Sequence, residues 1–319
     1  EYALGFTKRI GSRGSLRVDY VHRESKDMYA TQVDTTTGTI TGTLAGISRT
    51  FDKQIIVNTD AVERKYDGFT LNAQYRFFDA LTLQGNWTWS RLRGNNEGEN
   101  AASGPIRTGI LSYPEYFDRA WSYPVGDLSA DQRHKVRLWA IWDLPFHVDW
   151  MKSSVSFLGQ YDSGQPYGAV GTVDSKSYVP AAVNDAYLNE PTTVTYYFSA
   201  RDAFRTDDIY RADISLNFSF LPWKSVEVFV EPQVLNVFNN QNTFDLRYIS
   251  QTIQTRANTS TSSYAAFNPF TEQPKQGPAA TGGATPQYNW NYASTFGQAT
   301  NPLAYQTPRT FRISMGIRF

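Results

Sequence analysis

The stretch Thr310-Phe311-Arg312-Ile313-Ser314-Met315-Gly316-Ile317-Arg318-Phe319 alternates large apolar residues with polar or small ones. Successive side chains of a β-strand point to opposite faces, so this period of two predicts a strand with one apolar and one polar face. The stretch from Tyr210 to Phe220 repeats the pattern, with Arg211 and Asp213 among its polar positions. Both segments indicate an all-β chain.

Seven further stretches alternate in the same way. Together with the two above they predict about nine strands, several of them as long as the roughly 9 to 11 residues that cross a bilayer at a tilt. Pro232 falls inside one stretch and weakens it locally, because proline cannot donate a hydrogen bond to a neighbouring strand. The seven stretches cover residues 2–9, 16–20, 69–77, 81–90, 136–144, 155–161 and 225–236.

The connections between these stretches alternate between very short and very long. The short ones cover residues 11–14, 78–79, 145–149 and 221–224, and the long ones 24–65, 93–131, 163–208 and 239–306. A soluble β-sandwich also alternates apolar and polar residues, but has no reason to collect every long loop at one end. Outer-membrane barrels do so, with short periplasmic turns and long external loops. We therefore expect a transmembrane antiparallel β-barrel of the outer-membrane type.

Composition argues against several other classes. Acidic and basic residues are balanced at 30 each, so no net charge favours nucleic acid as a partner. The absence of cysteine excludes disulfides, thiol nucleophiles and Cys-ligated metals. No apolar run reaches the roughly 18 residues of a membrane-spanning helix. Residues 1–6 already alternate and are no signal peptide, so we expect the chain to begin inside a folded element.

The direction of the strands predicts an incomplete barrel. If the long loops are external, the first and the last strand run in the same direction and would be parallel if joined. An antiparallel barrel closes on an even number of strands. We therefore expect an amino-terminal region outside this chain to supply further strands.

Three short stretches resemble the carboxy-terminal half of TonB-dependent outer-membrane receptors, particularly the Oar-like group. The first, Leu128-Ser129-Ala130-Asp131-Gln132-Arg133-His134-Lys135, enters a strand after a long loop. The second, Leu235-Asn236-Val237-Phe238-Asn239-Asn240-Gln241, leaves a strand, and the third is the terminal stretch from Pro308 to Phe319. The likeness covers most of the chain in its order of strands and loops, but only these three stretches match in amino-acid sequence.

The resemblance implies a barrel of about 22 strands with a plug, of which residues 1–319 would form the last nine or so. The plug and the segment that contacts TonB would lie in the missing amino-terminal region. The resemblance also implies a signal for the barrel-insertion machinery at Met315, Ile317 and Phe319. The alternative for these residues is simply a last lipid-facing strand, since alternation serves both purposes.

Polar residues on the alternating strands supply the main candidate site. Lumen-facing candidates are Arg211, Asp213, Glu227, Glu231, Arg312 and Arg318, which either pair as structural ions or contact a substrate. The carboxylates at Asp207-Asp208 and at Glu97 and Glu99 could bind calcium or act as an acid–base pair. Nothing in the sequence fixes the ligand geometry that calcium requires, so solvated loop residues are the favoured interpretation. The three histidines, His22, His134 and His147, lack metal-ligand spacing, and His134 fits a loop-to-strand hydrogen-bond network.

These observations lead us to expect a receptor or transporter in the outer membrane of a Gram-negative bacterium. Its partners would be the lipid bilayer, TonB, the barrel-insertion machinery and an unknown extracellular ligand, which is a peptide, a glycan or a metal chelate. The alternative is a structural barrel that displays its loops for surface assembly, for example with a surface lipoprotein. We expect no enzyme activity, no catalytic, cofactor or metal site, and no nucleic acid.

Overall fold

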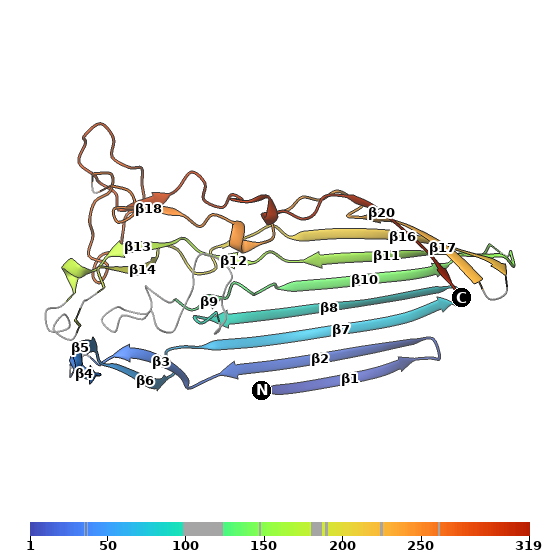
Figure 1. Ribbon diagram of the computed structural model, residues 1–319, viewed down its shortest axis with the longest axis horizontal. Coiled ribbons are helices and arrows are strands. Elements are labelled where there is room, and N and C mark those ends of the chain that lie inside the picture. The colour runs from blue at the N-terminus through green and yellow to red at the C-terminus, as the bar shows by residue number, and fades with distance from the viewer. Residues whose placement is uncertain are drawn as a thin grey trace.

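The computed structural model describes residues 1–34, 36, 38–97, 124–146, 148–179, 187–188, 191–223, 226–260 and 262–319. Within them one large antiparallel sheet dominates, and its long strands lie side by side in chain order (Figure 1). A short strand, β9 (Gly126–Asp127), pairs with the end of β8. The long strands are β1 (Tyr2–Ile10), β2 (Gly14–Ser25), β7 (Arg64–Phe78), β8 (Leu81–Gly94), β10 (His134–Asp143), β11 (Met151–Asp162), β16 (Ile209–Trp223), β17 (Val226–Leu235) and β20 (Thr310–Arg318).

Each of the stretches expected to be a strand coincides with one of these long strands, although three of them run one residue further, to Leu144, Asn236 and Phe319. The largest differences are at the loop ends of β2 and β7, where the strands also include residues 21–25 and 64–68. Pro232 acts as expected, because the pairing of β16 with β17 runs from Ser215 opposite Gln233 directly to Phe218 opposite Val230. The positions level with Pro232 are left out of this ladder, since proline has no N–H to donate.

The register keeps one apolar and one polar face continuous across the sheet. Residues paired between neighbouring strands point to the same face, so a row of partners shows what each face presents. One such row is apolar throughout, and the next is polar. The apolar row is Phe6, Val18, Leu71, Trp87 and Val136, and the polar row is Arg17, Asn72, Asn86, Arg137, Gln160 and Arg211.

Aromatic side chains gather near both ends of the apolar face. Tyr161 and Tyr210 lie 5.1 Å apart, ring centre to ring centre, near the long-loop end, and Trp150 and Phe220 lie 6.1 Å apart at the other. Tyr210 and Phe220 are separated by ten residues on β16, or about 33 Å along the strand. At the usual barrel tilt of about 45° this spans about 23 Å, close to the apolar band of an outer-membrane barrel.

The apolar face is open to its surroundings. Ile313 and Met315 of β20 expose 65% and 73% of their surface, and Leu4 of β1 exposes 76%. An apolar band of this extent is unfavourable in water, at about 25 cal/mol for each Å² exposed, and favourable in lipid. The sheet is therefore the wall of a transmembrane β-barrel of the outer-membrane type. No helix in the described residues is long and apolar enough to cross a membrane.

The long connections gather at one end of the sheet and fold into small sheets and turns of their own (Figure 1). The first carries two nested hairpins, in which β3 pairs with β6 and β4 pairs with β5. Much of the second lies outside the described residues. The elements of the first are β3 (Met28–Val33), β4 (Thr39–Leu44), β5 (Ile47–Asp52) and β6 (Gln54–Thr59). The third and fourth hold β12 (Pro166–Tyr167), β13 (Val170–Asp174), η2 (Lys176–Tyr178), β14 (Thr193–Tyr197), β15 (Phe204–Arg205), η3 (Leu246–Tyr248), β18 (Ile253–Thr255), β19 (Trp290–Tyr292) and η4 (Pro302–Ala304).

The buried apolar clusters lie in these connections rather than in the sheet. Tyr167 packs in a cluster with Leu246 and Ile249, and Ala169 packs with Ile253 and Trp290. Both clusters join residues 163–208 to residues 239–306, and we call this paired unit the loop cap. A hydrogen bond of 3.1 Å from Thr255 Oγ1 to the carbonyl of Thr172 also crosses it. The cap buries apolar surface from water, whereas the sheet offers its own to lipid.

We predict that the two faces of β11 respond oppositely to a charge. Phe157 belongs to the apolar face and its neighbour Ser156 to the polar face, opposite Ser215. The change Phe157→Lys should lower the free energy of unfolding by about 2–4 kcal/mol, the cost of a cation near the bilayer midplane. Ser156→Lys is the matched control and should cost less than about 1 kcal/mol. Urea unfolding in lipid vesicles measures both, and equal losses would contradict the assignment of the faces.

Candidate functional site

The six polar candidates on the strands form separate groups rather than one site. Arg318 donates a 2.8 Å hydrogen bond to Glu227, its cross-strand partner, and also stacks on Phe229. Arg211 and Asp213 pair with each other on β16 at 2.9 Å, two residues apart. Each ion pair is thus satisfied locally. This is the structural role that the sequence left open for these residues.

The remaining two candidates differ from each other. Glu231 accepts hydrogen bonds from Ser215 at 2.6 Å and from Gln233 at 2.8 Å. Arg312 lies opposite Gln233 and has no ion pair within the described part of the chain. Arg312 is therefore the candidate that is best placed to meet a group from outside this chain.

A buried cluster of charges joins the bases of the long loops to the sheet. We call Arg91, Asp127, Asp131, Arg133 and Arg205 the loop-base cluster. Asp127 accepts from Arg91 at 2.9 Å, from Arg133 at 2.7 Å and from Arg205 at 2.9 Å. Asp131 accepts from Arg205 at 2.8 Å and from the backbone N–H of Leu92. The cluster therefore links β8, β9, the entry to β10, and β15.

The two carboxylates of this cluster are buried. The side chain of Asp131 is fully buried and that of Asp127 is 8% exposed. Burial raises the pKa of Asp127, but the hydrogen bond from Arg91 and the charges of Arg133 and Arg205 outweigh it, so the pKa lies below its ordinary value. Asp127 therefore stays ionised at neutral pH. Two carboxylates shared among three guanidinium groups form a network, not a free binding site.

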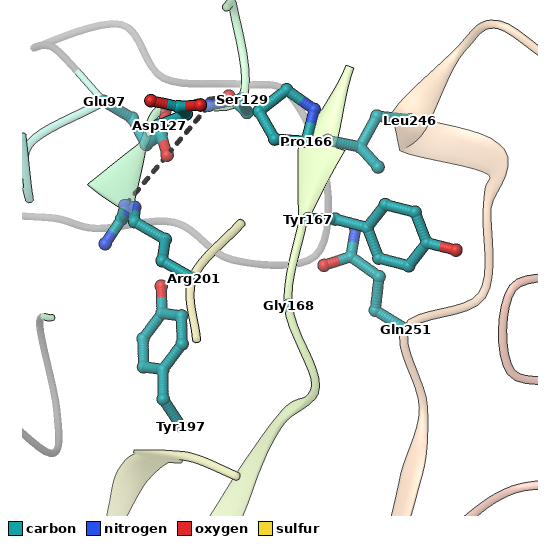
Figure 2. A pocket seen from close by; sticks show the side chains of 10 residues that line it. All are labelled: Glu97, Asp127, Ser129, Pro166, Tyr167, Gly168, Tyr197, Arg201, Leu246 and Gln251. Atoms are coloured by element: carbon teal, nitrogen blue, oxygen red, sulfur yellow. Dashed lines mark hydrogen bonds and ion pairs between the residues drawn. The ribbon is translucent and has the colours of Figure 1, made fainter. Parts of the chain in front are cut away.

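A second buried pair lies beside this cluster (Figure 2). Arg201 donates to Glu97 at 2.8 Å, and Ser129 donates to Glu97 through its hydroxyl at 2.7 Å and its backbone N–H at 3.0 Å. Asp202 accepts from the backbone N–H of Asp127 at 2.9 Å. Glu97, which the sequence offered as a calcium or acid–base group, is thus held by a guanidinium and a serine. Glu99 lies outside the described residues.

The other sequence candidates also have partners in the loops. Asp207 accepts from the hydroxyl of Thr243 at 2.6 Å, and Asp208 accepts from the backbone N–H of Gly164 at 2.9 Å. Both carboxylates tie the loop cap to the start of β16. In the ranges that the structure describes, no three or more His, Asp or Glu side chains come together as a metal site would require.

His22 of β2 and His134 of β10 lie apart, with β7 and β8 between them. The backbone N–H of His134 donates to Ser163 at 2.8 Å, and its ring lies 3.2 Å from the indole N–H of Trp87. This is the expected loop-to-strand network. His22 lies 2.8 Å from Asp67. His147 falls outside the described residues.

The cavity beside the second pair is small. Glu97, Asp127 and Arg201 line one side of it, and Tyr167 and Gln251 line the other (Figure 2). Its volume is about 20 Å³, which accommodates about one water molecule. A bulky ligand does not fit there. The region therefore positions the loops and is no capture pocket by itself.

Sequence reasoning found part of this arrangement. Asp131, Arg133 and His134 belong to a stretch singled out as a loop-to-strand entry, and Glu97 was a candidate carboxylate. Arg91, Asp127, Arg201 and Arg205 were missed, because their partners are up to 104 positions away along the chain. The available signal was one acidic or basic residue near the loop end of each of several strands.

The sheet also defines where the chain resides. A β-barrel is one of the two kinds of structure that span a bilayer, and the wall of long antiparallel strands with an apolar outer face is that of an outer-membrane barrel. The chain is therefore an outer-membrane protein.

Comparisons with known proteins gave matches among solved structures. The search against protein-family models and the search of curated proteins found no match. The structure is similar over 99% of its length to the ferripyoverdine receptor of the outer membrane of Pseudomonas aeruginosa (10% identity, TM-score 0.42) and to the outer membrane transporter YddB from Escherichia coli (13% identity, TM-score 0.44). A FadL homologue from Pseudomonas aeruginosa matches 76% of the chain (11% identity, TM-score 0.23). The chain spans 26%, 31% and 50% of those three chains, in that order.

We predict that Asp127 holds the loop bases together. Asp127→Asn leaves three guanidinium groups with one buried carboxylate, so it should destabilise the loop bases locally by about 1–3 kcal/mol, less than a fully buried pair because the arginines are partly exposed. Hydrogen exchange of the amides of Leu92 and Leu128 should quicken roughly 5- to 150-fold. Asp79→Asn, in a short turn, is the control and should change neither. Unchanged exchange in Asp127→Asn would contradict the role of the cluster.

The loop-base cluster should also weaken in acid. Because the folded pKa of Asp127 is lowered, its stabilising contribution is complete above the unfolded value of about 3.9 and is lost as pH falls through the folded value. Pepsin should therefore cleave the loops of the unchanged protein more slowly than those of Asp127→Asn at pH 4.5, and the two rates should converge toward pH 2. A constant ratio of the rates across this range would show that Asp127 does not titrate in the cluster.

Proposed function

We propose that the chain is part of an outer-membrane receptor that takes up a bulky substrate, a peptide, a glycan or a metal chelate. The observation that carries this proposal is the polar face that crosses the sheet from Arg17 to Arg211 and on to Arg318 beneath a folded loop cap. In a closed barrel the apolar face meets lipid, so the polar face lines the interior. The loop cap would then lie over the entrance to a polar passage.

The orientation follows from the loops. Long loops are external and short turns periplasmic in bacterial outer-membrane barrels, so we assign the loop cap to the cell surface. Capture would fall to the outer surface of the cap and transit to the polar face. Lumen-facing Arg211, Asp213, Glu227 and Glu231 would mostly hold one another, whereas Arg312 would contact the passing substrate or another part of the protein. We assign no catalytic step to the chain.

We further propose that the barrel closes through strands from outside this chain. Among the residues that the structure describes, the backbone groups along the outer edges of β1 and β20 have no neighbouring strand, a costly state in lipid. β1 and β20 run in the same direction, so an odd number of strands must lie between them for an antiparallel barrel. With 22 strands in all, 13 would complete it. That region would also carry the plug and the contact with TonB.

The carboxy-terminal strand supports a role in barrel assembly. Met315, Ile317 and Phe319 expose 73%, 63% and 102% of their surface along one face of the chain end. We propose that the barrel-insertion machinery binds these side chains before the strand reaches lipid. The same three residues would afterwards lie in the apolar face.

One observation favours the alternative of a surface-assembly barrel. The hairpin β4–β5 carries Ile40 opposite Phe51 and Leu44 opposite Ile47 on one face, and these side chains are 53% to 84% exposed. The other face is a ladder of hydroxyl pairs, Thr41 with Thr50 and Thr43 with Ser48. An exposed apolar face at the long-loop end suits contact with a surface lipoprotein, a role that is compatible with transport.

The uptake proposal is tested by growth of a deletion strain on single nutrient sources. Ferric chelates, oligopeptides and oligosaccharides serve as the panel. We expect loss of growth on one class, restored by the unchanged protein, and the same loss when TonB is inactivated. Unimpaired growth on all three classes, with stable co-purification of a surface lipoprotein, would instead support the assembly role.

Localisation and size are tested on the native protein. It should remain with outer-membrane vesicles through a high-salt wash and migrate differently on gels with and without heating. Its intact mass should exceed the 36.1 kDa of these residues two- to threefold if the plug and further strands belong to the same polypeptide. Recovery in the soluble periplasm would end the barrel proposal, and a mass of 36.1 kDa would remove the same-chain plug.

A further inference from the structure

The polar face of the sheet contains an apolar patch, formed by Trp139, Ile141 and Leu158. Trp139 and Ile141 lie two residues apart on β10, and Leu158 of the neighbouring β11 lies directly opposite Trp139 (Figure 1). On its other side Trp139 lies opposite Gln84 of β8. Because successive side chains of a strand alternate, these three apolar residues share the polar face, whereas Leu138 lies on the apolar face.

The patch is open rather than packed. Ile141 and Leu158 expose 47% and 45% of their surface, and Trp139 is half-buried. The indole of Trp139 makes no hydrogen bond and no ring contact with the part of the chain that the structure describes. Leu158 lies opposite Asp213 of β16, between the two aromatic pairs that mark the ends of the apolar face. The patch therefore lies at the depth of the apolar band, but on the interior side of the wall.

The positions around Trp139 are almost all uncharged. Eight residues border it on this face, as cross-strand partners, as diagonal neighbours or two positions away on β10. Among these eight, two complete the apolar patch, five carry an amide or a hydroxyl, and Arg137 alone is charged. Arg137 is paired with Asp162 at 2.7 Å. The five neutral polar neighbours are Thr82, Gln84, Asn86, Ser156 and Gln160.

Four side-chain amides form a block beside Trp139. Asn72 of β7 lies opposite Asn86 of β8, and Gln74 lies opposite Gln84. Within the ranges that the structure describes, none of these four side-chain amides forms a hydrogen bond. Each amide offers both donors and an acceptor. This amide block can therefore hydrogen-bond a ligand that lies against the indole.

An aromatic ring beside neutral amides suits a neutral sugar. The C–H face of a pyranose ring is apolar and lies flat on an aromatic ring, while the hydroxyl groups around its rim donate and accept hydrogen bonds. An ionised ligand would need an opposite charge, and the charge nearest to Trp139 is already paired. A polypeptide segment would cover Ile141 and Leu158 equally well, but it has no requirement for an indole.

We propose that Trp139 and the amide block form a binding site for a neutral oligosaccharide on the interior wall of the barrel. Trp139 stacks on one sugar ring, and Ile141 and Leu158 extend the apolar platform toward the next ring. The amide block hydrogen-bonds the hydroxyl groups. The proposal rests on the uptake function proposed above, within which it selects the glycan as the substrate class.

The test uses the native protein in lipid nanodiscs and saturation-transfer NMR. The neutral probes are cellohexaose, maltohexaose and chitohexaose, and hexagalacturonate is the anionic probe of the same length. Trp139→Leu removes the ring but keeps an apolar side chain, Trp139→Phe keeps a ring, and Gln84→Ala removes one amide. Leu138→Ala is the matched control, because this side chain lies one residue away on the apolar face and is 39% exposed. Heat-dependent migration on gels verifies that each variant is folded.

We expect a neutral probe to bind and the anionic probe to bind more weakly. Trp139→Leu should weaken binding about three- to tenfold, the contribution of one ring contact, and Trp139→Phe should retain most of the affinity. Gln84→Ala should weaken binding about two- to tenfold, the contribution of one hydrogen bond, and Leu138→Ala should not change it. If Trp139→Leu does not fold, the comparison of Gln84→Ala with Leu138→Ala decides.

Two results would overturn the sugar site. One is equal binding of the neutral probes by the unchanged protein and by Trp139→Leu or, if that variant does not fold, by Gln84→Ala. The other is the absence of binding by all three neutral probes. If the sugars do not bind and Trp139→Gln lowers the unfolding midpoint of the native protein, the patch packs against a polypeptide segment instead.

The growth panel separates this proposal from the uptake function. Loss of growth on ferric chelates or oligopeptides, with unimpaired growth on oligosaccharides, would uphold uptake and overturn the sugar site as a substrate site. Unimpaired growth on all three classes would remove uptake, whereas sugar binding that depends on Trp139 would still uphold the binding site.

Discussion

Every backbone N–H and C=O group within a bilayer must find its partner inside the protein, because lipid offers none. Between its two edge strands, the sheet meets this requirement by pairing each long strand with the next along the chain, from β1 to β20. The rest of the molecule depends on this ladder. It fixes the register, and the register puts paired apolar side chains such as Phe157, Ile214 and Val234 on the same side of the sheet. A shift of one residue would turn Phe157, Ile214 and Val234 toward water and bring their polar neighbours to lipid.

The loops obey the opposite condition. Outside the bilayer, water satisfies the backbone, and stability comes from burying apolar surface. The long connections therefore develop what the sheet lacks, compact clusters around Tyr167, Ile253 and Tyr196. Between the two regions lies the loop-base cluster, where ionic hydrogen bonds replace both lipid contact and apolar packing. The chain thus contains three regions, stabilised by lipid contact, by apolar packing away from water and by buried ion pairs.

The sequence predicts the sheet well because its signal is local. A period of two over ten residues specifies a strand and both of its faces, and the contrast of short and long connections specifies which ends lie together. The loops are harder for the same physical reason. The contact of Tyr167 with Leu246 and the pairing of Arg205 with Asp127 join positions about 80 residues apart, and no local pattern encodes such partners. The polar candidates lie between these cases: Glu227 and Arg318 were found as polar positions, but their pairing needed the register.

The loop cap is a single folded unit built from two separate lengths of chain, with β16 and β17 between them. Its halves share one interior, in which Thr255 bonds to Thr172 and Ile253 packs on Ala169. A substitution in one half therefore changes the packing of the other half. Variation in the loop cap would therefore have to alter both halves together. Replacing either loop alone with that of another barrel would leave the shared apolar core without its matching partner. The two loops should therefore be replaced or retained together.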